Sequence, residues 1–281
     1  MIIIEKEYIK SPLNYVGGKY KLLKQIIPLF PDNINTFIDL FGGGFNVGIN
    51  VKANKIIYND VISQVVNMLD YFKSNETETV LNKIDGLINK YSLSKENKEG
   101  YLELRELYNN GNTDPIVLYT LICYSFNNQI RFNSQGKFNM PFGKDRSSFN
   151  PTLRNKFIIF LEQLHKGNYY FLNNDFKQIN INKLHSNDFV YCDPPYFNST
   201  ATYNENGGWT EDNEKELLYL LDTLHSQGCK FALSNNLKYD NPLLEEWKNK
   251  YNIRYLNIDY SNCNYQKKDK SKDIEVLITN Y

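Results

Sequence analysis

Four consecutive residues, Asp193-Pro194-Pro195-Tyr196, have the clearest chemical potential in this 281-residue chain. Two prolines in a row fix φ twice and remove two backbone donors, so the turn is rigid and the Pro194 carbonyl stays free as an acceptor. Asp193 adds a carboxylate acceptor and Tyr196 adds a flat ring. Together they complement a planar heterocycle that carries an NH2 group. If both acceptors bind the amine hydrogens, the nitrogen lone pair is directed outward for attack.

A turn of this kind needs a strand end to present it. The apolar run 189–192 directly precedes it, and open α/β sheets bind ligands at the carboxyl ends of their strands. A second run, 36–41, ends in three glycines and is followed by a third at 55–58, which predicts a βαβ unit and hence a parallel sheet. Further strands are predicted at 169–172 and 229–234, and a terminal antiparallel hairpin at 253–258 and 274–279.

Helical periodicity predicts the elements around these strands. Leucines on one face predict a helix over 211–225 with Gly228 as its C-terminal cap, and another helix is predicted over 19–30. Residues 62–165 are mainly helical in pattern, broken by a polar segment at 127–150. The sequence therefore predicts an α/β catalytic domain formed by 1–61 and 166–281, interrupted by a mostly helical subdomain at 62–165.

The composition restricts the class of protein. Hydrophobic residues make up 41% and charged residues 23% of the chain, which is typical of a folded globular protein. Lys and Arg (32) balance Asp and Glu (32), which excludes a uniformly basic nucleic-acid binder but allows a local cationic groove. The four cysteines form no C-x-x-C pair and the three histidines show no metal spacing, so no metal is expected. The apolar run 2–4 is too short for a signal peptide, and no run reaches the roughly 18 residues of a membrane span, which favours a soluble cytoplasmic protein.

With these motifs the sequence resembles the Dam-type DNA adenine N6-methyltransferases, the D12 class of the alpha group, from about Leu13 to Tyr281. The segment Tyr15-Val16-Gly17-Gly18-Lys19 is similar to the family's aromatic-x-G-G-K motif, where the aromatic residue and the lysine help to bind S-adenosylmethionine. The segment Asp39-Leu40-Phe41-Gly42-Gly43-Gly44 is similar to its P-F-x-G-x-G loop, although Phe45 stands where the last glycine is expected. The resemblance implies a Rossmann-like S-adenosylmethionine-dependent methyltransferase sheet.

The resemblance also implies a set of cofactor-binding residues. Glycines allow the backbone to approach the cofactor closely, and Asp60, at the next strand end, is placed for ribose hydroxyls. Asp175 and Phe176 fall where the family holds the cofactor adenine. The expected cofactor residues are therefore Tyr15, Lys19, Asp39, Phe41, Gly43, Asp60, Asp175, Phe176 and Asp193.

A polar segment looks very like the family's R-x-N-x-x-G-x-F-N-x-P-x-G motif, which forms a β-hairpin that enters DNA. It runs RFNSQGKFNMPFG over 131–143, so the resemblance places a DNA-contacting hairpin near 127–145. Arginine suits guanine or phosphate, asparagine suits adenine or backbone, and glycine suits the turn. The expected DNA-binding residues are Arg131, Asn133, Gly136, Lys137, Asn139 and Pro141, with Lys267 and Lys268 in a basic loop that either contacts phosphate or is simply solvated. Phe138 either wedges into DNA or packs.

The resemblance implies a site-specific DNA adenine N6-methyltransferase that flips an adenine out of a short duplex site, GATC by analogy. It would transfer a methyl group from S-adenosylmethionine, leaving S-adenosylhomocysteine, and a separate restriction endonuclease is a candidate partner. Three alternatives stay open. Methylation of cytosine N4 or of a protein amide would leave the hairpin unexplained, a silent DNA-binding module would leave Asp193–Tyr196 without a purpose, and a nicotinamide-dependent oxidoreductase is suggested by the glycine turn. Residues 197–210 are expected to form a flap over the pocket.

Overall fold

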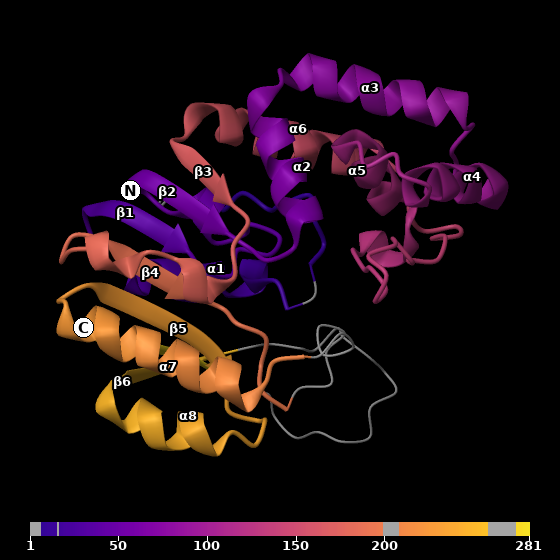
Figure 1. The fold of residues 1–281 in the computed structure, drawn as a ribbon. Helices are drawn as coiled ribbons and strands as arrows, with labels where there is room; N and C mark the ends of the chain where they lie inside the picture. Colours follow the sequence, from indigo (N-terminus) through magenta and orange to yellow (C-terminus); the bar gives the residue numbers. More distant parts are fainter. Residues whose placement is uncertain (1–6, 16, 199–207, 258–273) are drawn as a thin grey trace.

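The computed structural model describes residues 7–15, 17–198, 208–257 and 274–281. In this part of the chain the strands form one seven-stranded sheet in the order β3-β2-β1-β4-β5-β7-β6 (Figure 1). The strands are β1 (Ile34–Asp39), β2 (Ala53–Asn59), β3 (Tyr169–Leu172), β4 (Phe189–Cys192), β5 (Lys230–Asn236), β6 (Asn252–Leu256) and β7 (Glu275–Thr279). The first five strands of that order, from β3 through β2, β1 and β4 to β5, are parallel. Strand β7 lies antiparallel between β5 and β6. The predicted α/β class and the antiparallel terminal pair are confirmed.

The central strands are buried on both faces, which explains why they appear as continuous apolar runs. Successive side chains of a strand point to opposite faces. Phe189 and Tyr191 of β4 therefore join one apolar core, and Val190 and Cys192 join a second core on the other face. The sheet thus separates two cores and holds the end of β4, where Asp193 follows, between them.

Helix α7 (Glu211–Ser226) covers the second core together with α8 (Pro242–Trp247). Leu217, Leu221 and Leu224 are fully buried, as the predicted helical face requires. Gly228 follows the helix with φ of 76°, a conformation that glycine adopts without a Cβ clash. The predicted helix and its glycine cap are confirmed (Figure 1).

The helix predicted over 19–30 is wrong as a single regular element. The structure has three short turns there, η1 (Lys19–Leu22), α1 (Leu23–Ile26) and η2 (Ile27–Leu29). Pro28 lacks the N–H that would continue the α-helical ladder, so the chain tightens into 3-10 geometry. Leu22, Leu23 and Ile26 still bury the expected face.

Between β2 and β3 the described chain is mainly helical. The helices are α2 (Ser63–Ser74), α3 (Thr77–Lys90), α4 (Lys98–Asn109), α5 (Pro115–Tyr124) and α6 (Pro151–Lys166). Helix α5 is apolar all round and is buried from Ile116 to Tyr124, because the other helices surround it. Figure 1 shows α3, α4 and α5 set apart from β5 and β6 at the far edge of the sheet.

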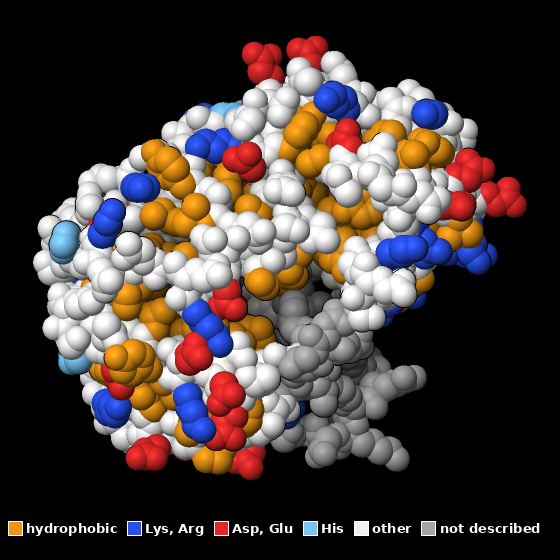
Figure 2. All heavy atoms as spheres, in the orientation of Figure 1, with side chains coloured by type: hydrophobic (Ala, Val, Ile, Leu, Met, Phe, Trp, Pro, Cys, Tyr) orange, Lys and Arg blue, Asp and Glu red, His pale blue; other side chains and the backbone are white. Residues whose placement is uncertain are grey.

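The surface carries no dominant sign of charge on the side that Figure 2 displays, where Lys and Arg are interspersed with Asp and Glu. This matches the balance of 32 basic and 32 acidic residues. Within the described residues, none of the helices has the length and apolar composition needed to cross a bilayer.

Candidate active site

A cavity of about 1090 Å³ lies at the carboxyl ends of β1, β2 and β4 and is also lined by the start of α2 and by residues of the segment 130–136. Figure 2 shows a hollow on this side of the molecule. All of the predicted catalytic and cofactor residues line it, namely Tyr15, Lys19, Asp39, Phe41, Gly43, Asp60, Asp175, Phe176, Asp193, Pro194, Pro195 and Tyr196. Among the predicted DNA-binding residues, Arg131, Asn133 and Gly136 line it, whereas Lys137, Asn139 and Pro141 do not. Lys267 and Lys268 lie outside the described residues, as does most of the expected flap.

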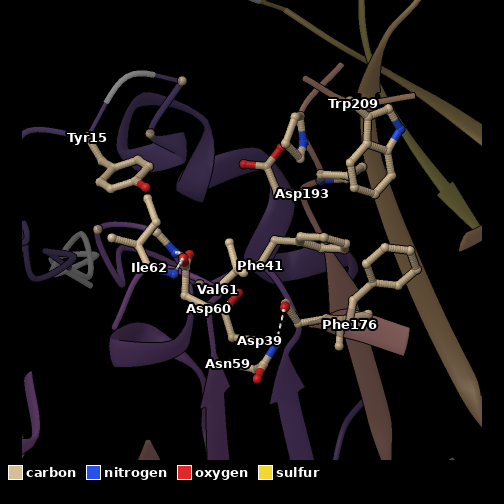
Figure 3. A pocket seen from close by; sticks show the side chains of 18 of the residues that line it. Tyr15, Asp39, Phe41, Asn59, Asp60, Val61, Ile62, Phe176, Asp193 and Trp209 are labelled. Carbon is tan, nitrogen blue, oxygen red and sulfur yellow. Dashed lines mark hydrogen bonds between the residues drawn. The ribbon is translucent and has the colours of Figure 1, made fainter. Parts of the chain in front are cut away.

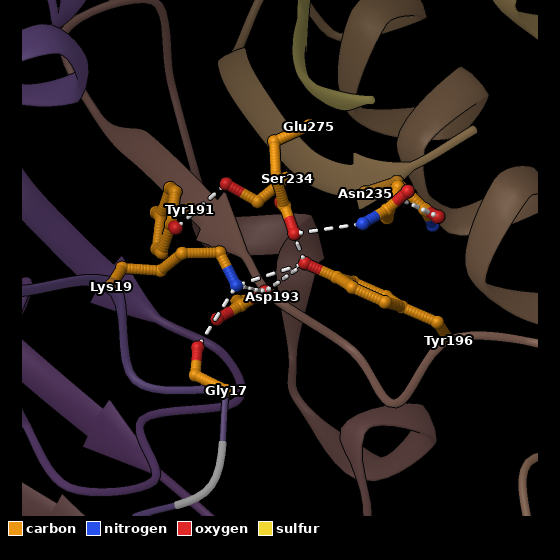
Figure 4. Close-up of polar contacts among 9 residues, drawn as sticks. Gly17, Lys19, Tyr191, Asp193, Tyr196, Ser234, Asn235 and Glu275 are labelled. Atoms are coloured by element: carbon orange, nitrogen blue, oxygen red, sulfur yellow. Dashed lines mark hydrogen bonds and ion pairs between the residues drawn. The ribbon is translucent and has the colours of Figure 1, made fainter. Parts of the chain in front are cut away.

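The carboxylate of Asp193 is paired with a lysine in this structure (Figure 4). Its Oδ1 atom lies 2.7 Å from the Lys19 ammonium, whose side chain is only 6% exposed. Burial raises the pKa of Asp193, and Lys19 opposes that rise. Among the described residues no donor reaches the Pro194 carbonyl. Of the two expected acceptors, one therefore has no donor among the described residues, and the other is held on Oδ1 by a cation.

Lys19 uses its three protons within the protein. It donates to the Gly17 carbonyl at 3.1 Å and to the Tyr196 hydroxyl at 2.9 Å, besides the ion pair with Asp193. The resemblance led us to expect that Lys19 helps to bind the cofactor, and that expectation stays a prediction. In this structure the lysine joins the N-terminal glycine segment to the turn after β4.

Tyr196 continues this network to a second carboxylate. Its hydroxyl donates to Oε2 of Glu275 at 3.0 Å, and Nδ2 of Asn236 donates to Oε1 of Glu275 at 3.1 Å. Glu275 begins β7 and Asn236 ends β5, and the two residues are cross-strand partners. Neither residue was predicted from the sequence. A glutamate at the start of the otherwise apolar run EVLIT was the available signal.

The glycine loop after β1 fits closely around its neighbours. A Cβ atom on Gly42 would lie 2.1 Å from the Tyr58 ring, and one on Gly43 would lie 3.3 Å from the Tyr15 ring. Gly43 also has φ of 47°, which other residues adopt only with strain. The loop therefore lets the backbone form the cavity wall without side chains that would occupy the space.

Two acidic residues hold that loop (Figure 3). Asp39 accepts the Gly48 N–H at 3.0 Å, and burial raises its pKa to about 7, helped by the charges of Asp193 and Asp60. Asp60 accepts the N–H groups of Gly43 and Ile62, each at 2.9 Å. Both carboxylates face the cavity, but each also accepts backbone hydrogen bonds, a role that was not predicted from the sequence.

Three aromatic rings gather at one end of the cavity (Figure 3). The Phe41 centroid lies 5.4 Å from that of Phe176 and 5.6 Å from that of Trp209, and Phe176 and Trp209 are 5.4 Å apart. The indole N–H of Trp209 donates to Glu214, which is buried. Trp209 falls within the segment 197–210 that was expected to form a flap over the pocket, but it was not predicted as a site residue. Asp175, beside this cluster, accepts the Lys177 N–H at 3.0 Å.

The segment at 131–139 turns back on itself as the hairpin prediction requires, but through single bridges instead of regular strands. Phe132 and Phe138 form a bridge, and Asn139 N donates to the Arg131 carbonyl at 3.1 Å. The Arg131 guanidinium binds the Asn139 side chain at 2.9 Å. Asn133 Oδ1 accepts the N–H groups of Gln135 and Lys137, so this side chain shapes the turn.

The hairpin is attached to α4. Asn109 exchanges two hydrogen bonds with the Phe138 backbone, at 2.9 and 3.0 Å, and Tyr101 binds the Met140 carbonyl at 2.8 Å. Phe138 is 1% exposed, so of its two predicted roles it takes packing. The exposed tip at 134–137 remains, with Gly136 at φ of 72°. Ser134 and Gly136 of this tip line the cavity together with Arg131 and Asn133.

Strand order and site together define the class of protein. A parallel sheet with β7 inserted antiparallel between β5 and β6, and a ligand cavity at the carboxyl ends, is the S-adenosylmethionine-dependent methyltransferase fold. The chain belongs to the family described as D12 class N6 adenine-specific DNA methyltransferase, whose sequence profile matches residues 15–262.

Named relatives agree with this family. The chain is 52% identical over 281 residues to the Type II methyltransferase M.FokI of Planomicrobium okeanokoites, and 44% identical over 285 residues to the modification methylase StsI of Streptococcus sanguinis. Each match covers 98% of this chain but 43% of the relative, so the chain spans less than half of their length. The DNA adenine methylase of Escherichia coli K12 is 24% identical, with 88% of this chain and 86% of that protein covered.

Proposed function

We propose that this chain is the catalytic unit of a restriction-modification DNA methyltransferase that methylates N6 of an adenine flipped out of duplex DNA. The observation that carries the proposal is the acidic proline turn at the cavity: the Pro194 carbonyl has no donor among the described residues, and Asp193 lies beside it at the wall of the same cavity. Two acceptors in this arrangement suit an aromatic NH2 group. Family membership and the names of the two relatives support the same reaction.

The residues around the cavity fit S-adenosylmethionine. The rings of Phe41, Phe176 and Trp209 are suited to a purine, which prefers offset or edge contacts with aromatic neighbours. The bare backbone at Gly43 allows close approach beneath the Tyr15 ring. Bound here, the cofactor supplies a methyl group already activated on a sulfonium, leaving S-adenosylhomocysteine as the product.

The protein's own task is to receive and orient the base. Removing a base from the duplex costs a few kcal/mol, which contacts in the pocket must offset. We assign the ring of Tyr196 to stacking, and Asp193 with the Pro194 carbonyl to the two amine hydrogens. Holding reactants in an attack geometry can contribute roughly 7–11 kcal/mol to catalysis, and because the methyl group is already activated on sulfur, the proposal includes no strong base before attack. A negative Asp193 also stabilises the positive charge that develops on the amine nitrogen.

Residues 62–165 are proposed as the target-recognition subdomain of this catalytic unit, with 1–61 and 166–281 as its catalytic domain. Arg131 lines the cavity, and the tip at 134–137 is exposed, which supports contact with the duplex by this hairpin. Lys267 and Lys268 are assigned to phosphate contacts. GATC remains the first candidate target because the hairpin motif resembles that of the Dam-type enzymes, and a separate restriction endonuclease is the proposed partner.

The test is methyl transfer from tritiated S-adenosylmethionine to duplexes of defined sequence, followed by nucleoside analysis. We expect label in N6-methyladenine. Label in N4-methylcytosine, or in no nucleoside, would reject the function. A GATC duplex compared with its permuted sequences tests the target, and genomic DNA read by sequencing identifies another site if GATC is not the substrate.

Asp193→Asn tests the assigned role of the carboxylate. An amide keeps one acceptor and the size of the side chain but removes the charge, so we expect kcat to fall at least about a hundredfold. Lys19 then loses its ion pair, and the buried ammonium is expected to lower the melting temperature as well. DNA and cofactor affinity, measured by titration, should change much less. A wild-type kcat in this variant would contradict the role.

A further inference from the structure

The second carboxylate of the site, Glu275, lies outside residues 15–262 matched by the family profile. Its side chain is held on both oxygens, by the Tyr196 hydroxyl at 3.0 Å (Figure 4) and by Asn236 at 3.1 Å. The residue is 6% exposed. A buried carboxylate is costly unless it is bonded in this way, and an apolar residue could begin a sheet strand without that cost. The cost of burying the Glu275 carboxylate therefore indicates that this residue has a role in the site.

The sheet fixes where this carboxylate lies. Glu275 and Asn236 are directly opposite each other in the antiparallel β5–β7 pair. Their hydrogen bond is thus a cross-strand contact between two backbones that the sheet already aligns. Because both residues are buried, the Glu275 carboxylate has little freedom to move, which makes it a rigid support for Tyr196.

The Tyr196 hydroxyl has a single proton to donate. It accepts a hydrogen bond from Lys19 at 2.9 Å, lies 3.0 Å from Glu275, and is 3.5 Å from Asp193. The shorter contact directs the proton to Glu275. Asp193 then retains acceptor capacity that a donating tyrosine would have taken. Glu275 consequently decides both the position of the ring and the acceptor state of Asp193.

We propose that Glu275 is a positioning residue for methyl transfer: it holds Tyr196 by the hydroxyl, fixes the ring at the cavity wall, and leaves the acceptor capacity of Asp193 that Lys19 does not use available to the target amine. This inference rests on the proposed function. It gives a role in catalysis to a residue of β7, a strand that follows the catalytic turn by some 80 positions and joins it only through the sheet.

The test compares Glu275→Gln with the wild-type protein. Glutamine has the same length, but its amide presents one acceptor and one donor, so it cannot accept from both Tyr196 and Asn236. We expect kcat to fall by about tenfold to a hundredfold, as for the loss of a hydrogen bond to a charged group. The KM values for DNA and cofactor should change less than about threefold, because the contact acts on the arrangement of the ring and carboxylate and not on overall binding. Glu162→Gln, on the exposed surface of α6, is the matched control and should have the wild-type kcat.

Two further variants separate positioning from a purely structural role. Glu275→Asp keeps the charge but is one methylene shorter, so it should lose the Tyr196 contact and be slow as well. Adding Glu275→Gln to Tyr196→Phe should lower kcat little beyond Tyr196→Phe alone, because the partner hydroxyl is already absent. Calorimetric titration with S-adenosylmethionine gives the fraction of binding-competent protein, which corrects kcat for any misfolded material.

The outcomes are distinguishable. A wild-type kcat in Glu275→Gln or in Glu275→Asp overturns this inference and leaves the proposed function intact. Fully additive effects of Glu275→Gln and Tyr196→Phe also overturn it, because the two groups would then act independently. A wild-type protein that methylates no adenine overturns both the inference and the function on which it rests.

Discussion

Phe45 adopts a left-handed backbone, with φ of 60°, at the loop position where the resemblance led us to expect glycine. Its ring is fully buried and packs edge-on against Tyr58 at 5.2 Å and Tyr169 at 5.5 Å between centroids. It is absent from the cavity lining. Phe45 therefore adopts the backbone conformation expected of glycine while its side chain joins the core. The backbone strain of about 1–2 kcal/mol is offset by burial of the phenylalanine ring.

This balance predicts that Phe45→Gly destabilises the fold. Removing a buried phenylalanine side chain costs about 3–5 kcal/mol, which exceeds the relief of about 1–2 kcal/mol of backbone strain, so a net loss of about 1–4 kcal/mol is expected in urea unfolding. Phe45→Leu, which retains part of the apolar volume, is the milder control. A Phe45→Gly protein as stable as the wild type would show that strain, and not packing, dominates at this position.

The hairpin shows how an element can divide its polar residues between shape and recognition. Asn133 closes the turn, Asn139 holds Arg131, and Asn109 of α4 fixes the base of the hairpin. Side chains whose donors and acceptors are already used are poor readers of base edges. Lys137 is exposed, and Arg131 lines the cavity and has guanidinium N–H groups beyond those bonded to Asn139, so we propose these two residues first for DNA contact.

We predict different effects for these two residues. Lys137→Ala should weaken binding to all duplexes alike and lower the slope of log K against log salt by about one, as for one lost phosphate contact. Arg131→Ala should instead reduce discrimination between sites, with cofactor affinity unchanged. Fluorescence anisotropy at several salt concentrations measures both effects.

Lys166→Ala, on the last turn of α6 and 72% exposed, is the control for removal of a positive charge. An unchanged salt slope in Lys137→Ala would exclude a phosphate contact there, and an unchanged site preference in Arg131→Ala would remove the hairpin from target recognition.

At the scale of the whole molecule, the site lies where two apolar cores and the helical layer meet, and this arrangement buries several acids together. Burial raises the pKa of Asp39 to about 7 and also raises the pKa values of Asp60 and Asp193. A folded state that holds a proton more tightly than the unfolded chain loses stability as pH rises from the ordinary pKa toward the raised one. Acids with lowered pKa values, such as Asp188, reach their full stabilising effect at pH values below this range. Their effect on the unfolding free energy therefore stays constant within it.

We therefore predict that unfolding free energy falls between pH 5.5 and 7.5 and that Asp39→Asn reduces this fall. In the wild-type protein, Asp39 is expected to lower the unfolding free energy by about 2 kcal/mol over that interval. This value follows from about 1.36 kcal/mol for each pH unit between pH 5.5 and the raised pKa. Asparagine can still accept from Gly48. Urea titrations at both pH values measure the difference, with the exposed Asp32→Asn as control. A wild-type pH dependence in Asp39→Asn would show that Asp39 does not titrate in this range.

The sequence by itself determined the sheet class, the helix at 211–226, the acidic proline turn and the family, because each depends on local periodicity, turn chemistry or a contiguous motif. These signals are short-range in the sequence. For the strands, the burial of the continuous apolar runs confirms the prediction. Even the cavity could be located, since the carboxyl ends of parallel strands meet at one edge.

Tertiary structure alone decided which polar groups pair. Lys19 and Asp193 lie 174 positions apart, and Tyr196 and Glu275 lie 79 apart, so no local pattern relates them. The same holds for Trp209, whose place beside Phe41 and Phe176 depends on a buried contact with Glu214. Hydrogen bonds and ion pairs depend on distances of a few ångströms between side chains from different elements, and only the packed sheet sets those distances.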